Sequence, residues 1–306
     1  MLKIFFLFAV LLTYSAHAQF QLGVFAGLSD YNGDLLDKPY RYSQGCFGLA
    51  GGYQFSDRFT VRAEIARGKI KGKDEVSYVR GFSQRNLNFQ SSLSEFSMVG
   101  EYNLFNLKNM RWTPFAFTGI AVYHYNPYTF DQNNEKFYLK PLSTEGQGLD
   151  QYPERKPYSL TRLALPIGGG LKYAVNDRMQ VAAQIGLRVT NNDYLDDVST
   201  TYVDQNDLLA ARGPKAVELS YRADELPGGN LTYPPNGASR GRNGKIIYTD
   251  FYYFSGVSII LNVGGNGDAN HRGSSNQESI ANKGRGATHG GVSRQNKRSY
   301  GCPQVR

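Results

Sequence analysis

Cysteine is nearly absent from the chain: Cys46 and Cys302 are the two in 306 residues. Two thiols cannot build the disulfide framework of a small secreted domain, and we expect both to be free. Cysteine is also missing directly after Ala18, where the leader discussed below would be cleaved, which argues against a lipid anchor at that point. The sequence therefore predicts neither a disulfide scaffold nor a lipoprotein.

Histidine is scarce as well, which limits catalysis. Three of the four histidines lie in the N-terminal leader or near the C-terminus, and His124 alone lies near the end of a predicted strand. A general base needs a nucleophile within hydrogen-bond reach, and no serine or cysteine can be placed beside His124. We predict no catalytic residue, no cofactor and no resident metal.

Long apolar runs are also missing. The longest, Ile4–Leu12, is too short for a membrane helix and is followed by Thr13 and Ser15. With Lys3 before it and Ala16-His17-Ala18 after it, the run is typical of a signal peptide. We expect residues 1–18 to be removed by cleavage between Ala18 and Gln19.

The positive charge of the chain is concentrated at its end. The net charge is +8, and residues 264–306 hold seven basic and two acidic residues, a net +5. The rest is too weakly basic for a folded nucleic-acid-binding module. Residues 264–306 are rich in Gly, Ser and Asn and are predicted to be a disordered tail. This tail either tethers the protein to an acidic partner or the cell wall, or is a solvated extension without a binding role.

Period-2 alternation is the strongest structural signal present. Between Met179 and Thr190, aliphatic residues occupy every odd position, as expected for a strand with one apolar face. The 22 Tyr and 18 Phe residues are typical of interfacial aromatic girdles in membrane barrels. The same alternation gives eight candidate strands: 20–28, 46–55, 59–69, 87–102, 113–125, 159–174, 179–190 and 248–263.

The connections between these strands alternate in length. Three are short, and the others are the long segments 29–45, 70–86, 126–158 and 191–247. Short periplasmic turns alternating with long outer loops are typical of outer-membrane barrels, although a soluble sandwich remains the alternative. We predict an all-β fold: an eight-stranded antiparallel transmembrane β-barrel over residues 19–263, with long extracellular loops, periplasmic termini and outer-membrane lipid around it.

Several charged residues fall on the predicted inner face. An eight-stranded barrel has an interior just wide enough to be filled by side chains. Because unpaired buried charges are costly, we predict an internal ion-pair network rather than an ion or proton pathway. Its members are Arg62, Glu64, Glu95, Glu101, Lys172 and Arg188.

Two groups of loop residues could supply oxygen ligands for Ca²⁺. Their spacing does not fit an EF-hand, so turn formation and capping are the default interpretation. The groups are Asp193, Asp196, Asp197 and Asp204, and separately Asp30, Asn32 and Asp34.

Five stretches of sequence resemble the PorG-like outer-membrane β-barrel family of Bacteroidetes, which is associated with the type IX secretion system and gliding motility. They are Gly23–Leu35, Arg85–Ser97, Pro114–Pro127, Leu142–Gly148 and Asp193–Asp204. The last two are the most specific, because no barrel constraint demands them. These two family loop motifs contain Ser143, Thr144, Glu145, Gly146, Gln147, Gly148, Asp193, Tyr194, Asp196, Asp197, Ser199, Thr200, Tyr202 and Asp204.

The resemblance implies a non-enzymatic scaffold or anchor of the secretion machinery. It also implies contact with periplasmic ring lipoproteins of the PorK and PorN types, and no cofactor. The alternative is an outer-membrane barrel enzyme or a surface receptor that uses the loops 126–158 and 191–247. A cluster of His, Asp and Ser at the outer rim would favour the enzyme.

Overall fold

The computed structural model describes residues 19–36, 38–74, 84–241 and 249–263. Its strands are β1 (Gln19–Asn32), β2 (Gln44–Gln54), β3 (Phe59–Lys73), β4 (Asn88–Asn103), β5 (Trp112–Phe130), β6 (Lys136–Tyr138), β7 (Thr161–Ala174), β8 (Met179–Thr190) and β9 (Phe251–Val263). Its helical segments include η3 (Lys140–Leu142), α2 (Gln205–Arg212), α3 (Pro214–Ser220) and η4 (Ala223–Glu225). The predicted signal peptide and the predicted tail lie outside the described residues.

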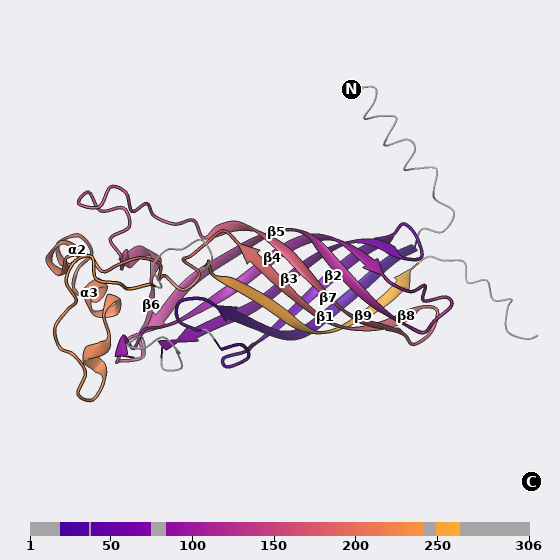
Figure 1. The fold of residues 1–306 in the computed structure, drawn as a ribbon, viewed down its shortest axis with the longest axis horizontal. Helices are drawn as coiled ribbons and strands as arrows, with labels where there is room; N and C mark the ends of the chain where they lie inside the picture. Colours follow the sequence, from indigo (N-terminus) through magenta and orange to yellow (C-terminus); the bar gives the residue numbers. More distant parts are fainter. Residues whose placement is uncertain (1–18, 37, 75–83, 242–248, 264–306) are drawn as a thin grey trace, which may run out of the picture. The chain divides into compact units, whose positions relative to one another are not determined.

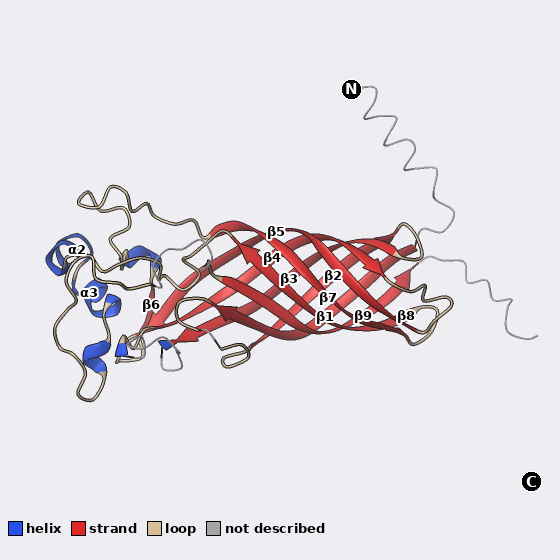
Figure 2. Cartoon of the chain, in the orientation of Figure 1, coloured by secondary structure: helices blue, strands red, loops and turns tan. Residues whose placement is uncertain are grey.

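Eight of these strands form a closed antiparallel barrel (Figures 1 and 2). The strands pair in the order β4-β3-β2-β1-β9-β8-β7-β5, and pairing of β4 with β5 closes the ring. β6 pairs with β5 and forms a short hairpin beyond the barrel. The predicted fold class is confirmed.

The alternation in sequence becomes an apolar outer surface. In β8, the side chains of Ile185 and Val189 are 49% and 41% exposed, whereas Ala182 and Arg188 point inward and are buried. Exposed aliphatic and aromatic side chains recur on every barrel strand, and we call this surface the apolar belt. It includes Leu22, Val24, Phe47, Leu49, Ile65, Phe96, Met98, Ile120, Leu163, Leu165, Ile167, Ile185 and Ile259.

Aromatic side chains gather where the strands meet the short turns. Tyr53 packs edge-on against Phe20 and Phe55, and Trp112 packs edge-on against Phe105. Amphipathic rings at this level are typical of the girdles that flank a lipid-facing band. A band of exposed apolar side chains bordered by aromatic rings is the surface of an outer-membrane-type barrel.

The two ends of the barrel differ as the sequence predicts. Three short turns lie at one end, where β1 begins and β9 ends, and α2, α3 and β6 lie at the other (Figure 1). None of the helices in the described residues is long and apolar enough to cross a membrane.

Three strands extend further toward the long loops than predicted. β1, β3 and β5 end at Asn32, Lys73 and Phe130 rather than at residues 28, 69 and 125. Each extension is paired, for example Lys73 with Asn88 of β4. The predicted strands were too short because hydrophobic alternation ends where a strand leaves lipid, whereas backbone pairing continues.

The main hydrophobic core fills the barrel mouth at the long-loop end. Tyr31, Phe89 and Tyr252 point inward from the strands and are fully buried. Loop residues, among them Leu195 and Val198, pack onto these rings in the same core. The long loops are therefore an integral cap that closes the mouth.

Candidate functional site

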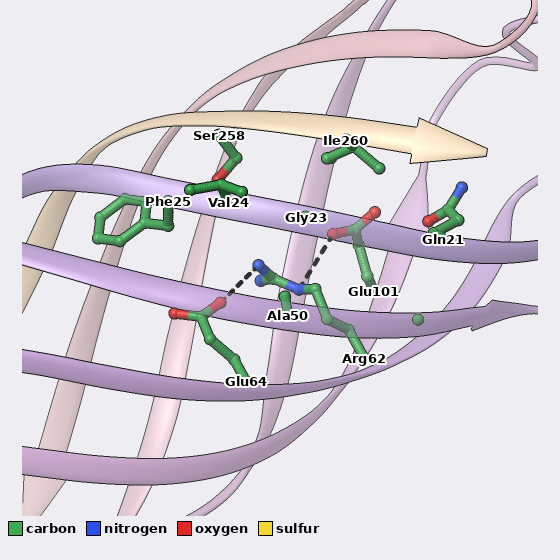
Figure 3. A pocket seen from close by; sticks show the side chains of 11 residues that line it. Gln21, Gly23, Val24, Phe25, Ala50, Arg62, Glu64, Glu101, Ser258 and Ile260 are labelled. Carbon is green, nitrogen blue, oxygen red and sulfur yellow. Dashed lines mark hydrogen bonds and ion pairs between the residues drawn. The ribbon is translucent and has the colours of Figure 1, made fainter. Parts of the chain in front are cut away.

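The interior of the barrel contains two groups of ion pairs, and all six predicted interior charges belong to them. In the first, Arg62 pairs with Glu64 at 2.8 Å and lies 3.9 Å from Glu101 (Figure 3). Lys172 reaches the same Glu101 from β7. Three cations and three anions balance over the six residues, which removes the penalty of unpaired buried charge.

The second group lies nearer the mouth. Arg188 of β8 donates to both carboxylate oxygens of Glu95 from Nε and Nη2, at 2.9–3.3 Å. The hydroxyl of Tyr252 donates to Oε2 of Glu95 at 2.7 Å, and the guanidinium lies over the ring of Phe254. A bidentate pair of this kind fixes both side chains.

Little free space remains around these charges. A cavity of about 10 Å³ lies beside Arg62, Glu101 and Ser258 (Figure 3), roughly the space that one water molecule needs. Nε of Arg62 and Oγ of Ser258 make no hydrogen bond within the described chain, so a single water fits here. Among the described residues, the lumen around these charges is packed rather than porous.

The two family loop motifs meet in the cap. Glu145 of the first motif is fully buried, and its carboxylate accepts hydrogen bonds from the backbone N–H groups of Ser199 and Thr200 in the second. The hydroxyls of Thr200 and Tyr194 also donate to Oε2 of Glu145, at 2.7 and 3.2 Å. In return, Asp197 accepts from Thr144 of the first motif. Residues about 50 positions apart thus form one polar cluster.

Local backbone geometry shapes the first motif. Ser143, Gly146 and Gly148 adopt left-handed φ angles of 48°, 75° and 75°. A Cβ on Gly146 would lie 2.7 Å from Cγ1 of Val203. Glycine is therefore needed at position 146 both for its φ and for close packing against the second motif.

Arg240 completes the cluster, and sequence reasoning missed it. Its Nη1 donates to Oε1 of Glu145 at 3.1 Å and to the carbonyl oxygen of Asp197 at 2.8 Å, and the side chain is 2% exposed. Arg85, bound to Asp74 by two hydrogen bonds, in turn donates to the carbonyl oxygen of Arg240. A lone arginine in a polar loop is usually solvated, so the sequence held no signal for this role.

The acids grouped as calcium ligands are distributed over several roles. Asp204 caps α2 by accepting from the N–H of Asn206 at 2.8 Å. Asp193 accepts from the hydroxyl of Ser199 at 2.7 Å, and Asp30 accepts from a loop serine. These are the capping and turn roles that short polar side chains ordinarily have.

Asp34 and Asp196, from the two separately predicted groups, come together with Asp250. All three are buried, and their carboxylate oxygens lie within 4.8 Å of one another. The hydroxyl of Tyr31 lies 2.6 Å from Asp196 and 3.1 Å from Asp250. Burial, together with the neighbouring carboxylates, raises the pKa of Asp196 and of Asp250 well above its ordinary value. Such a trio can share protons or offer oxygen ligands to a cation.

Other residues of the two family loop motifs make packing contacts within the cap. Tyr194 stacks on Tyr158 with ring centroids 4.9 Å apart, and buried Tyr202 packs edge-on against Tyr221. Gln147 is buried at the wall of a pocket that is described below.

His124 is the one histidine among the described residues. It is exposed on the outer face of β5, and its Nδ1 lies 2.9 Å from the hydroxyl of Thr161 on β7. Its hydrogen-bond partner is a neutral hydroxyl rather than a carboxylate, so within the described residues His124 is not the centre of a Ser-His-Asp arrangement.

Known proteins with solved structures include several of similar topology. Neisserial surface protein A is 9% identical, with 80% of this chain and 99% of that chain covered and a TM-score of 0.40. OprG from Pseudomonas aeruginosa is 13% identical, with 81% and 97% covered and a TM-score of 0.36. Ail of Yersinia pestis is 8% identical, with 81% and 99% covered and a TM-score of 0.37.

No curated protein matches the sequence. One family model does, over residues 2–211, and this region contains seven of the eight barrel strands together with both family loop motifs. The chain therefore belongs to the family described as a domain of unknown function, DUF6089.

Proposed function

We propose that the protein is a non-enzymatic scaffold or anchor of the type IX secretion system in the outer membrane. The lumen is packed and charge-balanced and lies beneath a closed cap. This observation supports a role in which the barrel does not conduct solutes. No solute path is visible in the described residues, and the one histidine among them contacts a neutral threonine hydroxyl rather than a carboxylate. The proposed role uses the surfaces of the barrel, which are available to partners.

The apolar belt supports residence in a membrane. Leu49, Ile65, Ile120 and Leu163 come from four strands, and each is 64–70% exposed. Burying such surface in lipid contributes roughly 25 cal/mol per Å². Because a closed barrel has no unpaired strand edge, its backbone is compatible with hydrocarbon.

The PorG-like resemblance supplies the partner side of the proposal. Outer-membrane barrels place their short turns in the periplasm, and here the start of β1 and the end of β9 lie at the short-turn end. In that orientation β9 ends on the periplasmic side, where ring lipoproteins of the PorK and PorN types reside, and the basic residues 264–306 follow β9 in the sequence. The tail is then available to these lipoproteins or to the cell wall.

The proposal is tested by membrane fractionation, heat-modifiability on a gel, and crosslinked pull-down of the full chain. We expect a heat-shifted outer-membrane band that recovers ring lipoproteins, and loss of type IX secretion on deletion. A truncated chain that ends at Val263 keeps all eight barrel strands but lacks the tail. Partners that this chain still recovers contact the barrel, and partners that it loses contact the tail. Normal secretion in the deletion strain, or a soluble protein without a heat shift, would contradict the proposal.

A further inference from the structure

A pocket of about 470 Å³ lies in the cap beside the first family loop motif. Its wall comes from the end of β5, from β6 and η3, from residues 143–148, from residues 157–160 and from the last residue of α2. Ligand pockets commonly have volumes of about 300–1,000 Å³, so a small molecule fits.

The pocket wall contains a buried amide with an unmet donor. Gln147 is 2% exposed, and its Oε1 accepts from the N–H of Glu145 at 3.1 Å. That bond fixes the orientation of the amide, and no described atom accepts from its Nε2. On the same wall, Oδ1 of Asn126 receives no hydrogen bond from the described chain. An unpaired donor and acceptor are costly when buried, so a ligand that bonds both is favoured.

The charge of the wall selects an anion. Lys140 and Arg212 are its charged residues, and neither forms an ion pair with a described residue. Nε of Arg212 donates to the hydroxyl of Ser143 at 3.2 Å, which orients the guanidinium. Among the described residues, no acidic side chain lines the pocket. Two free cations without a counter-charge make a site for phosphate or carboxylate.

We propose that this pocket binds an anionic sugar, a hexose that carries a phosphate or a carboxylate. The anion lies between Lys140 and Arg212. Sugar hydroxyls, each both donor and acceptor, satisfy Gln147 and Asn126, and the apolar face of the ring packs on Pro157. The inference goes beyond the scaffold role and does not depend on it. The source is either a free sugar or the phosphorylated glycan of an outer-leaflet glycolipid.

The test is calorimetric titration of the purified full chain in detergent. Glucose 6-phosphate and glucuronate should bind, whereas glucose and inorganic phosphate should each bind about tenfold or more weaker, because each lacks one half of the recognition. Equal binding of glucose, or binding of an oligo-aspartate peptide with no binding of either sugar anion, would overturn the proposal.

Variants locate the binding. Lys140→Met and Arg212→Met should each weaken glucose 6-phosphate binding about tenfold. Gln147→Glu keeps the acceptor for the N–H of Glu145 but places a negative charge at the pocket, and should abolish binding. Arg41→Met is the matched control, because Arg41 is an exposed cation outside the pocket. Heat-modifiability verifies folding of each variant. If the pocket variants bind like wild type, the site is wrong.

Competition separates the two sources. Displacement of glucose 6-phosphate by purified lipopolysaccharide with a phosphorylated core identifies the glycolipid. Retention of the sugar phosphate identifies a free ligand. Both outcomes support the same recognition chemistry, whereas failure of both sugar anions to bind the folded wild-type chain refutes it and leaves the scaffold proposal unaffected.

Discussion

At the scale of single residues, the cap depends on carboxylates held away from water. Glu145 survives burial because backbone N–H groups, two hydroxyls and Arg240 all donate to it. Asp197 has Thr144 and Tyr158 as donors. Charged hydrogen bonds are stronger than neutral ones, but each lost partner leaves a buried group unsatisfied.

Glu145→Gln is expected to loosen the cap. The amide cannot accept from all the donors that face Glu145, and Arg240 loses its ion-pair partner, a change that typically costs about 3–5 kcal/mol. Limited proteolysis of residues 191–241 measures the effect as faster cleavage. Glu154→Gln is the control, because the Glu154 side chain is 69% exposed. Equal cleavage rates for the two variants would show that the Glu145 cluster does not hold the cap.

The cap should also respond to pH through Asp197. Burial raises the pKa of Asp197 to about 6, although Arg240, Thr144 and Tyr158 oppose the shift. An unfolded Asp titrates near pH 4, so between about pH 4 and 6 the folded state binds more protons and stability falls as pH rises. Its contribution is full below about pH 4 and is lost above about pH 6. Buried Asp196 and Asp250 act in the same direction.

The measurement is the protease susceptibility of the cap against pH, with a protease active across the range. Wild type should become more susceptible from pH 4 to 6, and Asp197→Asn should have a shallower slope because the neutral side chain does not titrate. An Asn variant with the wild-type slope would assign the pH dependence to other groups.

At the scale of elements, alternation predicted the strands, whereas the helices of the cap were missed. α2 begins with Asp204 as its N-cap and holds Asp207 in its first turn, a start signal that the sequence displays. However, α2 lies within a polar loop and has weak amphipathic character, so hydrophobic periodicity does not indicate a helix there. The extensions of β1, β3 and β5 toward the long loops were not predicted for the same reason, because their residues pair with neighbouring strands but do not face lipid.

Ile120→Arg tests whether the outer face of β5 meets lipid. Ile120 is 64% exposed and belongs to the apolar belt. A charged side chain on the lipid face near mid-membrane destabilises a barrel by about 2–4 kcal/mol, whereas a soluble barrel would tolerate it. We expect a reduced outer-membrane yield and a smaller heat-modifiable fraction. Ile120→Leu, the matched control, should resemble wild type, and an equal yield for both variants would argue against a lipid-facing β5.

At the scale of the whole molecule, a balanced interior and a packed mouth make the barrel a closed body. Glu101 connects β4 to β7 through Lys172 and lies beside Arg62 of β3. Cross-strand ion pairs of this kind resist opening of the ring because every partner is buried. None of the six interior charges is left without an ion-pair partner to attract a passing ion.

Lys172→Met should destabilise the barrel by about 3–5 kcal/mol, because Glu101 keeps Arg62 as its one remaining cation at 3.9 Å. Lys172→Met with Glu101→Gln should recover most of the loss, since both charges are gone. Urea unfolding followed on gels gives the order of stabilities. Planar-bilayer recordings should show no stable conductance for wild type or the double variant. A conducting wild type would refute the closed-body description.

The sequence by itself determined the barrel: strand number, antiparallel order, alternating turn lengths, lipid-facing side and inward charges all follow from period-2 alternation and loop spacing. These are local or periodic properties, so they can be read along one chain. The tertiary structure alone decided the cap. The meeting of Glu145 with Thr200 and Arg240, the convergence of Asp34, Asp196 and Asp250, and the pocket at Gln147 depend on loops that are distant in sequence. No periodic pattern encodes contacts of this kind, because which loop residues become buried is decided by packing over the mouth.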